Sequence, residues 1–173
     1  HPNQTFTAHS KPKDFNHIYF DIEGDERAVA VLEKVSRILN AHYFQITAKA
    51  KPYLHAAGVT ASNYLVALLS LSASIAEKGG IERKKAISAL MPLTQKTLDN
   101  AKKAANLEEA VSGPIVRGDV ETVAGHIKLL ESIPEIRRLY KLLGQLVLEI
   151  VQNGEKESDE TRQTLIKILQ DER

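Results

Sequence analysis

The sequence predicts a mainly helical protein that begins with a short β-α-β unit. Aromatic residues make up only 5% of the 173 residues and tryptophan is absent, so the core must consist of Leu, Ile, Val and Ala, which favours helix packed on helix. Runs of β-prone residues occur only near the start, whereas apolar residues recur at helical spacing beyond it. We therefore expect two parts, residues 1–48 and residues 49–173.

The composition limits the possible functions. The formal charge is +1, from 23 Lys and Arg against 22 Asp and Glu, so it gives no reason to expect nucleic acid or an anionic membrane as a partner. The absence of cysteine excludes thiolate catalysis, disulfides and Cys-ligated zinc. No H-E-x-x-H spacing occurs among the scattered histidines, so no metal site is predicted. We expect a cytoplasmic protein without a metal.

The first part resembles a fragment of a parallel sheet. Residues 1–16 form a predicted loop, residues 17–22 and 43–47 are β-prone, and Asp25 is placed to cap a helix between them. Strand, helix and strand within about 30 residues form a βαβ unit. Because two strands are not stable alone, and because the sequence opens at His1 and not at a methionine, we expect the remaining strands to come from a preceding region or another chain.

The second part opens with an unusually apolar segment. Between residues 54 and 76 there is no Asp, Glu, Lys or Arg, and His55 is the only basic side chain. The hydroxyl and amide side chains along the segment make it too polar for a typical membrane span. We expect a long helix that is buried on nearly all sides, at the centre of a bundle or a dimer, and that ends at Gly79 and Gly80.

Further amphipathic helices are predicted after this segment. They cover residues 82–105, where Pro92 should kink or split the helix, then residues 119–132, 134–153 and 158–170. Pro134 suits the first turn of its helix. The last helix carries few apolar residues among many charges, so we expect it at the periphery.

One group of polar residues near the start of the apolar helix could carry chemistry. Lys51, His55 and Asn63 are separated by four and eight residues, which places them on one helix face. A lysine or histidine there could act as a general acid toward a carbonyl, and an asparagine could orient a substrate. The alternative is a solvated helix start with a core histidine.

A second group follows the loop at residues 112–119. Asp119 can cap the next helix, and Arg117 at that helix entrance could grip a carboxylate or phosphate; Thr122 and His126 follow. The alternative is that Arg117 and Asp119 only pair with each other or cap the helix. A G-x-G-x-x-G fingerprint is absent, so these residues alone should not bind a nicotinamide cofactor.

Taken together, several motifs resemble a known family. They are His1-Pro2-x-Gln4-Thr5-Phe6, Glu23-Gly24-Asp25, Tyr53-Leu54-His55-Ala56-Ala57, Ser62-Asn63-Tyr64-Leu65, Pro92-Leu93, Thr97-Leu98-x-Asn100 and Gly113-Pro114-x-x-Arg117-Gly118-Asp119-x-x-Thr122-Val123-x-x-His126. In this order, over roughly residues 1–130, they resemble the C-terminal part of Rossmann-like proteins with a conserved domain of unknown function (domain of unknown function 2520). That group is similar to ketopantoate reductases, pyrroline-carboxylate reductases and deazaflavin-dependent NADP oxidoreductases.

The resemblance implies an architecture and a function. Residues 49–173 would form an all-helical domain like the C-terminal part of 6-phosphogluconate dehydrogenase, and residues 1–48 would be the remnant of a Rossmann sheet. The chain would form the substrate side of an interdomain cleft in an NADP- or NAD-dependent oxidoreductase, whose cofactor is bound mainly by a missing N-terminal domain. It would be a homodimer through the 54–76 helix. A non-catalytic dimerisation module and a small-molecule sensor are the alternatives.

The resemblance also implies roles for individual residues. His55, Lys51 and Asn63 would be catalytic, and His1 and Gln4 would contact the cofactor. A small-molecule substrate would be bound by four further residues, Arg117, Asn100, Thr122 and His126.

Overall fold

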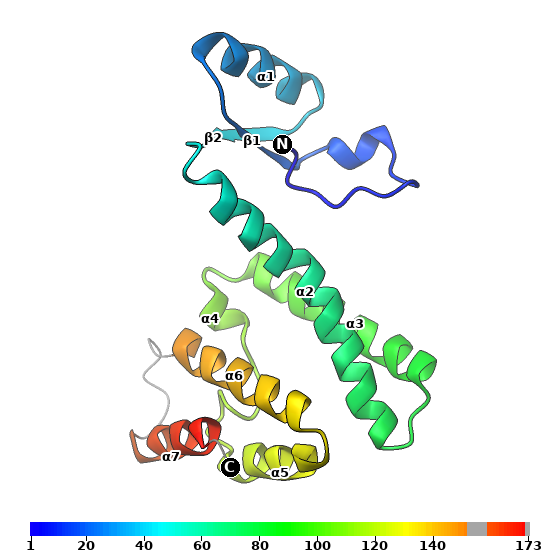
Figure 1. Cartoon of the computed structure of the whole chain (residues 1–173), viewed down its shortest axis with the longest axis vertical. Helices are drawn as coiled ribbons and strands as arrows, with labels where there is room; N and C mark the ends of the chain where they lie inside the picture. The colour runs from blue at the N-terminus through cyan, green and yellow to red at the C-terminus, as the bar shows by residue number, and fades with distance from the viewer. Residues whose placement is uncertain (152–158, 172–173) are drawn as a thin grey trace. The chain divides into compact units, whose positions relative to one another are not determined.

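The computed structural model describes residues 1–151 and 159–171 of the chain. The chain divides into two compact units, residues 1–72 and residues 73–173. The predicted fold class is confirmed, because a short parallel β-α-β unit precedes a series of helices (Figure 1). The long helix α2 (Lys51–Lys78) contains the boundary between the units.

The first unit is built on the predicted β-α-β element. Strands β1 (Tyr19–Ile22) and β2 (His42–Gln45) pair in parallel, with Tyr19 opposite His42 and Ile22 opposite Gln45. Helix α1 (Glu26–Ile38) connects them and packs against both. Its N-cap is Asp25, as predicted, whose carboxylate accepts a hydrogen bond from the Ala28 amide at 2.8 Å.

The residues before β1 cover its outer edge. The amide of Asn3 donates to the Tyr19 carbonyl at 2.8 Å, and the Asp21 amide donates to the His1 carbonyl at 3.0 Å, so the chain start runs antiparallel to β1. A 3-10 turn, η1 (Pro12–Phe15), follows before the chain enters β1. Among the described residues, β2 pairs with β1 alone, and its other edge is open.

One face of this small sheet carries exposed aromatic side chains. Tyr19 and Phe44 are exposed, and the Tyr19 ring stacks on His42 with the ring centroids 4.8 Å apart. Parallel sheets in folded proteins are normally covered on both faces. The β-α-β unit therefore has the character of an incomplete sheet.

Helix α2 differs from its prediction in its surroundings. It spans the predicted segment, but only 6% of its most apolar 18-residue window is buried, and Tyr64 and Val66 are 58% and 68% exposed. The prediction of a helix buried on nearly all sides is wrong for the single chain. An apolar composition indicates that a helix needs a covering partner, but it does not say whether that partner belongs to the same chain. Among the described residues, α2 is the one helix long and apolar enough to cross a membrane by length and composition.

Three hydroxyl groups of α2 are satisfied by its own backbone. Thr60, Ser62 and Ser72 donate to the carbonyls of Ala56, Gly58 and Leu68, one turn earlier, at 2.7–3.0 Å. Such bonds remove the cost of placing a hydroxyl in apolar surroundings. These side chains therefore do not oppose burial of α2 against an apolar partner.

The second unit contains the remaining helices. These are α3 (Arg83–Lys103), α4 (Leu107–Ala110), α5 (Val120–Leu129), the 3-10 turn η2 (Leu130–Ser132), α6 (Pro134–Ile150) and α7 (Asp159–Gln170). Pro92 lies inside α3 without splitting it. Pro134 occupies the first turn of α6, as predicted. The predicted extension of that helix to residue 153, and residue 158 before α7, lie outside the described residues.

The core of the second unit lies between α5, α6 and α7. It consists of six buried aliphatic side chains, Ile115, Val123, Ile127, Leu148, Leu165 and Leu169. The prediction that the last helix is peripheral is wrong, since Leu165 and Leu169 are among the least exposed side chains of the chain. These two leucines are one turn apart on α7 and therefore lie on the same helix face. Gly144 of α6 has no side chain, so Leu169 can pack closely against it.

Candidate functional site

The clearest polar cluster lies at the carboxyl end of β1 and the start of α2. The Lys51 ammonium forms an ion pair with the Glu23 carboxylate at 3.0 Å, which ties the turn after β1 to the first turn of α2. Ligands of parallel α/β sheets bind beyond the carboxyl ends of the strands. Lys51 is thus at a suitable place to contact a ligand, and its ion pair with Glu23 holds the side chain there.

A second contact at the same strand end joins His1 and Asp21. Asp21 is 6% exposed, and its Oδ1 lies 3.4 Å from the His1 Nδ1, while the terminal amine of His1 donates to the Asp21 carbonyl at 2.8 Å. The 3.4 Å contact is an ion pair when the imidazole is protonated, but it lacks hydrogen-bond geometry. Within the described residues, Asp21 Oδ1 therefore has no hydrogen-bond partner.

The other residues predicted at this site are accessible. His55 is exposed one turn after Lys51, so the alternative of a core histidine is wrong. Asn63 lies two turns further along α2, exposed, and its Oδ1 accepts a hydrogen bond from the Ser62 hydroxyl at 2.9 Å. Gln4 uses its side-chain oxygen locally, accepting from the Thr5 amide at 2.9 Å.

The residues of this unit do not fit the phosphates of a dinucleotide. At the turn from β1 into α1, the helix N-terminus is already capped by the Asp25 carboxylate, whose negative charge opposes a phosphate. The turn from β2 into α2, residues 46–50, contains no glycine that would let a phosphate approach the backbone. Neither of these two turns therefore provides a binding site for the phosphates of such a cofactor.

The remaining predicted residues lie in the second unit. Asp119 caps α5, with its two carboxylate oxygens accepting from the Thr122 amide at 3.0 Å and the Thr122 hydroxyl at 2.7 Å. The hydroxyl bond first, then the amide bond, and to a smaller extent the nearby Arg117 and His126, hold the pKa of Asp119 below its usual value. Thr122 is thus engaged in the helix cap.

Arg117 is available for a ligand. It is exposed, and among the described residues its side chain forms no ion pair, although Asp119 is two residues away. Two glycines with positive φ angles flank Arg117 in its loop, Gly113 at 120° and Gly118 at 66°. Only glycine adopts such angles without strain. Of the alternative interpretation, the helix cap by Asp119 is confirmed, whereas an ion pair between Arg117 and Asp119 is absent from the described residues.

His126 and Asn100 complete the predicted set. The His126 Nδ1 lies 2.8 Å from the hydroxyl of Tyr140 on α6, with the two rings edge to face. Partial burial raises the pKa of Tyr140, so its hydroxyl stays protonated at neutral pH. Asn100 is exposed near the end of α3.

The predicted residues are thus divided into two groups, one in each unit. The contacts join Lys51 to Glu23 and His1 to the buried Asp21, and sequence reasoning missed the roles of these two carboxylates. A carboxylate inside a four-residue strand was the available signal, because such a residue is rarely buried without a partner. The other predicted residues of the first unit are Gln4, His55 and Asn63. Among the described residues, no cluster of His, Asp and Glu could hold a metal ion.

A family model for a domain of unknown function, DUF2520, matches residues 18–147. The chain belongs to the DUF2520 family. This confirms the family predicted from the motifs, and the match extends to Val147, beyond the motifs that suggested it. No curated protein sequence matches the chain.

Two solved structures resemble this DUF2520 chain. Protein TM1727 from Thermotoga maritima superposes with a TM-score of 0.75 at 32% identity, over 88% of this chain and 60% of that one. A protein from Bacteroides fragilis named putative NADP oxidoreductase BF3122 superposes with a TM-score of 0.70 at 24% identity, over 86% of this chain and 55% of that one. The chain therefore spans somewhat more than half the length of each.

Proposed function

We propose that this chain is the substrate-binding and dimerisation part of an NADP- or NAD-dependent oxidoreductase located in the cytoplasm. The main observation in support is the likeness in fold to the Bacteroides fragilis protein, which is named putative NADP oxidoreductase BF3122. The bare aromatic face of the β1–β2 sheet and the open edge of β2 support the proposal, because a nucleotide-binding domain would supply further strands and a covering layer.

The residues at the carboxyl end of β1 suggest how this part would act. The Lys51 ammonium or the His55 imidazole would deliver a proton to the oxygen or nitrogen of a reduced carbonyl or imine. Glu23 positions the Lys51 side chain through the 3.0 Å ion pair. In the second unit, Arg117 is exposed and would bind a carboxylate group. When bound, the nicotinamide supplies the hydride.

The proposal is tested with a protein in which this chain follows the nucleotide-binding part. NADPH is titrated by its fluorescence, and NADPH oxidation is then followed with a panel of oxo acids. We expect saturable binding, and a His55→Ala variant whose turnover falls about 100-fold, as for loss of a general acid. His9→Ala, in the exposed N-terminal loop, is the matched control and should leave turnover unchanged. No NADPH binding at about millimolar concentration, the upper range of ordinary KM values, would overturn the proposal.

A second candidate is a dimerisation module without catalysis. The bare apolar surface of α2 favours it, since a helix of this composition is stable in water only when a partner covers it. It predicts that His55→Ala and Arg117→Ala alter no ligand response in the same titration. Normal NADPH binding combined with loss of turnover in those variants would exclude it.

A further inference from the structure

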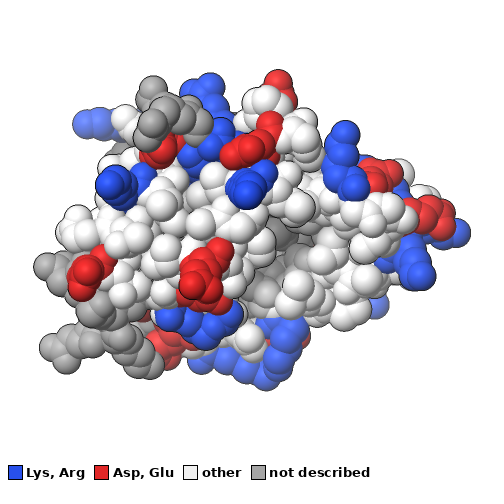
Figure 2. All heavy atoms as spheres, turned by 90° about the horizontal axis from the view of Figure 1, so that it is seen from below, with Lys and Arg blue, Asp and Glu red and all other residues white. Residues whose placement is uncertain are grey.

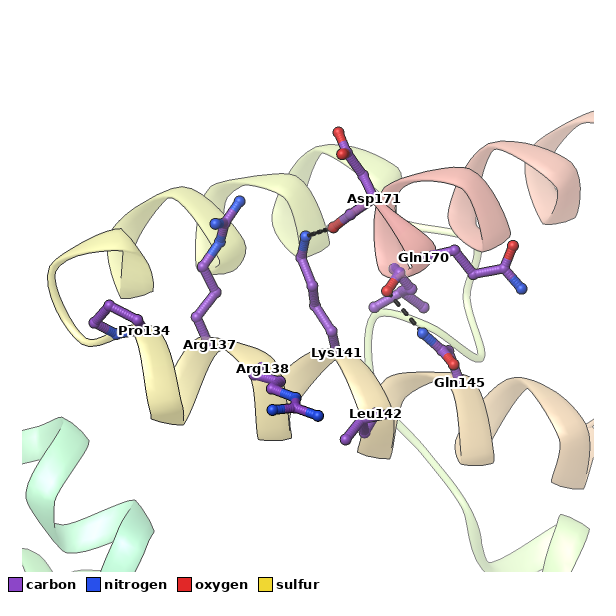
Figure 3. A pocket seen from close by; sticks show the side chains of 9 residues that line it. Pro134, Arg137, Arg138, Lys141, Leu142, Gln145, Gln170 and Asp171 are labelled. Atoms are coloured by element: carbon purple, nitrogen blue, oxygen red, sulfur yellow. Dashed lines mark hydrogen bonds between the residues drawn. The ribbon is translucent and has the colours of Figure 1, made fainter. Parts of the chain in front are cut away.

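A cavity of about 660 Å³ lies between α6 and the end of α7 (Figure 3). Its volume is in the range of small-molecule sites. It lies wholly in the second unit and shares no residue with either group of predicted site residues. Its lining consists of Pro134, Arg137, Arg138, Lys141, Leu142, Gln145, Leu169, Gln170 and Asp171.

Two side chains in this cavity fix the end of α7. Lys141 donates to the backbone carbonyl of Asp171, and Gln145 donates to the carbonyl of Leu169 at 2.8 Å. These bonds satisfy carbonyls that a helix leaves without partners at its C-terminus. These two hydrogen bonds account for the orientation of the Lys141 and Gln145 side chains.

Positive charge is in excess among the described residues that line the cavity. They include three cationic side chains and one carboxylate, that of Asp171. The α7 dipole contributes only about half a negative charge. Lys141 is 8% exposed, and burial, followed by the nearby Arg137, lowers its pKa. The surroundings therefore oppose the cationic form of Lys141, and an anion in the cavity would reverse this.

The arrangement of the side chains suits an organic anion. Arg137 and Lys141 rise side by side from successive turns of α6, and Leu142, which is 47% exposed, supplies apolar surface (Figure 3). A guanidinium binds carboxylate and phosphate groups in a bidentate manner. We propose that this cavity binds a small organic oxyanion, a carboxylate or phosphate ester, with its head between Arg137 and Lys141 and its apolar body against Leu142.

The test is calorimetric titration of the chain with phenyl phosphate, benzoate and benzyl alcohol. We expect saturable binding of one or both anions and none of the alcohol, and the comparison of the anions identifies the head group. Arg138→Gln should weaken binding about fivefold, as expected for one exposed charge contact, and Arg137→Gln should weaken it further. Lys128→Gln on α5 is the control, exposed and absent from the lining.

Two outcomes would overturn the proposal. One is the absence of saturation at about 10 mM anion, well above the millimolar Kd expected of a weak site. The other is binding that neither arginine substitution weakens while both variants keep the thermal unfolding midpoint of the wild type. Arg138 is exposed, so its replacement leaves the fold intact and the result interpretable.

Discussion

Gly144 shows how one residue controls the packing of the second unit. A Cβ at this position would lie 2.7 Å from one methyl of Leu169 and 3.3 Å from its other methyl and from the Ile115 Cδ1. All three groups belong to the buried core. The methyls of Leu169 cannot move aside freely, because their neighbours are equally buried. Gly144 is therefore required for the close approach of α6 and α7.

We predict that Gly144→Ala destabilises the chain by about 1–2 kcal/mol, because overpacking outweighs the gain in helix propensity. The matched control is Gly125→Ala on α5, where an added Cβ meets nothing within 4 Å. That change should stabilise by about 0.5–1 kcal/mol. Urea unfolding followed by circular dichroism measures both. Equal effects of the two substitutions would contradict the assigned packing.

A second residue-scale prediction concerns the cap of α5. The folded pKa of Asp119 lies below its usual value of 3.8, so the capping contribution is complete above the unfolded pKa and disappears as pH falls through the folded pKa. Asp119→Ala should lower the melting temperature at neutral pH, and the difference from wild type should shrink below about pH 4.

The control for this prediction is Asp119→Asn. Its side-chain oxygen can still accept the Thr122 amide bond, but it does not titrate, so its stability relative to Asp119→Ala should not change between neutral and acidic pH. A gap between wild type and Asp119→Ala that stays constant down to the acid transition would contradict the pKa assignment.

At the scale of elements, α7 is the helix whose role differs most from its prediction. Leu165 is fully buried between α5 and α6, although the helix is rich in charge. We predict that Leu165→Ala costs about 2–5 kcal/mol, the usual range for a large aliphatic side chain in a core. Lys167→Ala on the exposed face of the same helix should change stability by less than about 0.5 kcal/mol. Urea unfolding measures the loss of stability in both variants. Similar losses for Leu165→Ala and Lys167→Ala would indicate that α7 is peripheral.

These elements also show what the sequence can and cannot predict. The starts of α1, α5 and α6 follow from Asp25, Asp119 and Pro134, because caps and a first-turn proline act locally. The burial of α7 depends on the shape of α6, which a residue pattern does not encode. The Glu23–Lys51 ion pair joins residues 28 apart, and the contact of Asp21 with His1 depends on the path of the first residues, so neither could be read from spacing alone.

At the scale of the molecule, the distribution of charge and apolar surface indicates its mode of association. Figure 2 shows acidic and basic side chains interspersed between broad uncharged areas on the face viewed, which agrees with a net charge of +1. Side chains of both signs occur on this face, so it does not have the uniform charge that would attract a polyelectrolyte. Among the described residues, the main surface that lacks a covering partner is instead the apolar surface of α2, where Val66 and Tyr64 are exposed.

We predict that this surface is covered by α2 of a second copy, because the hydroxyls of Thr60, Ser62 and Ser72 are already satisfied by the backbone of α2 itself. Light scattering of the detergent-free chain should give the mass of a dimer. Val66→Glu should convert it to a monomer, because a carboxylate cannot be buried unpaired in an apolar interface. Leu129→Glu is the control, since Leu129 of α5 is equally exposed, at 69% against 68% for Val66. A monomer in the wild type, or partitioning of the chain into lipid vesicles, would show that α2 has a different partner.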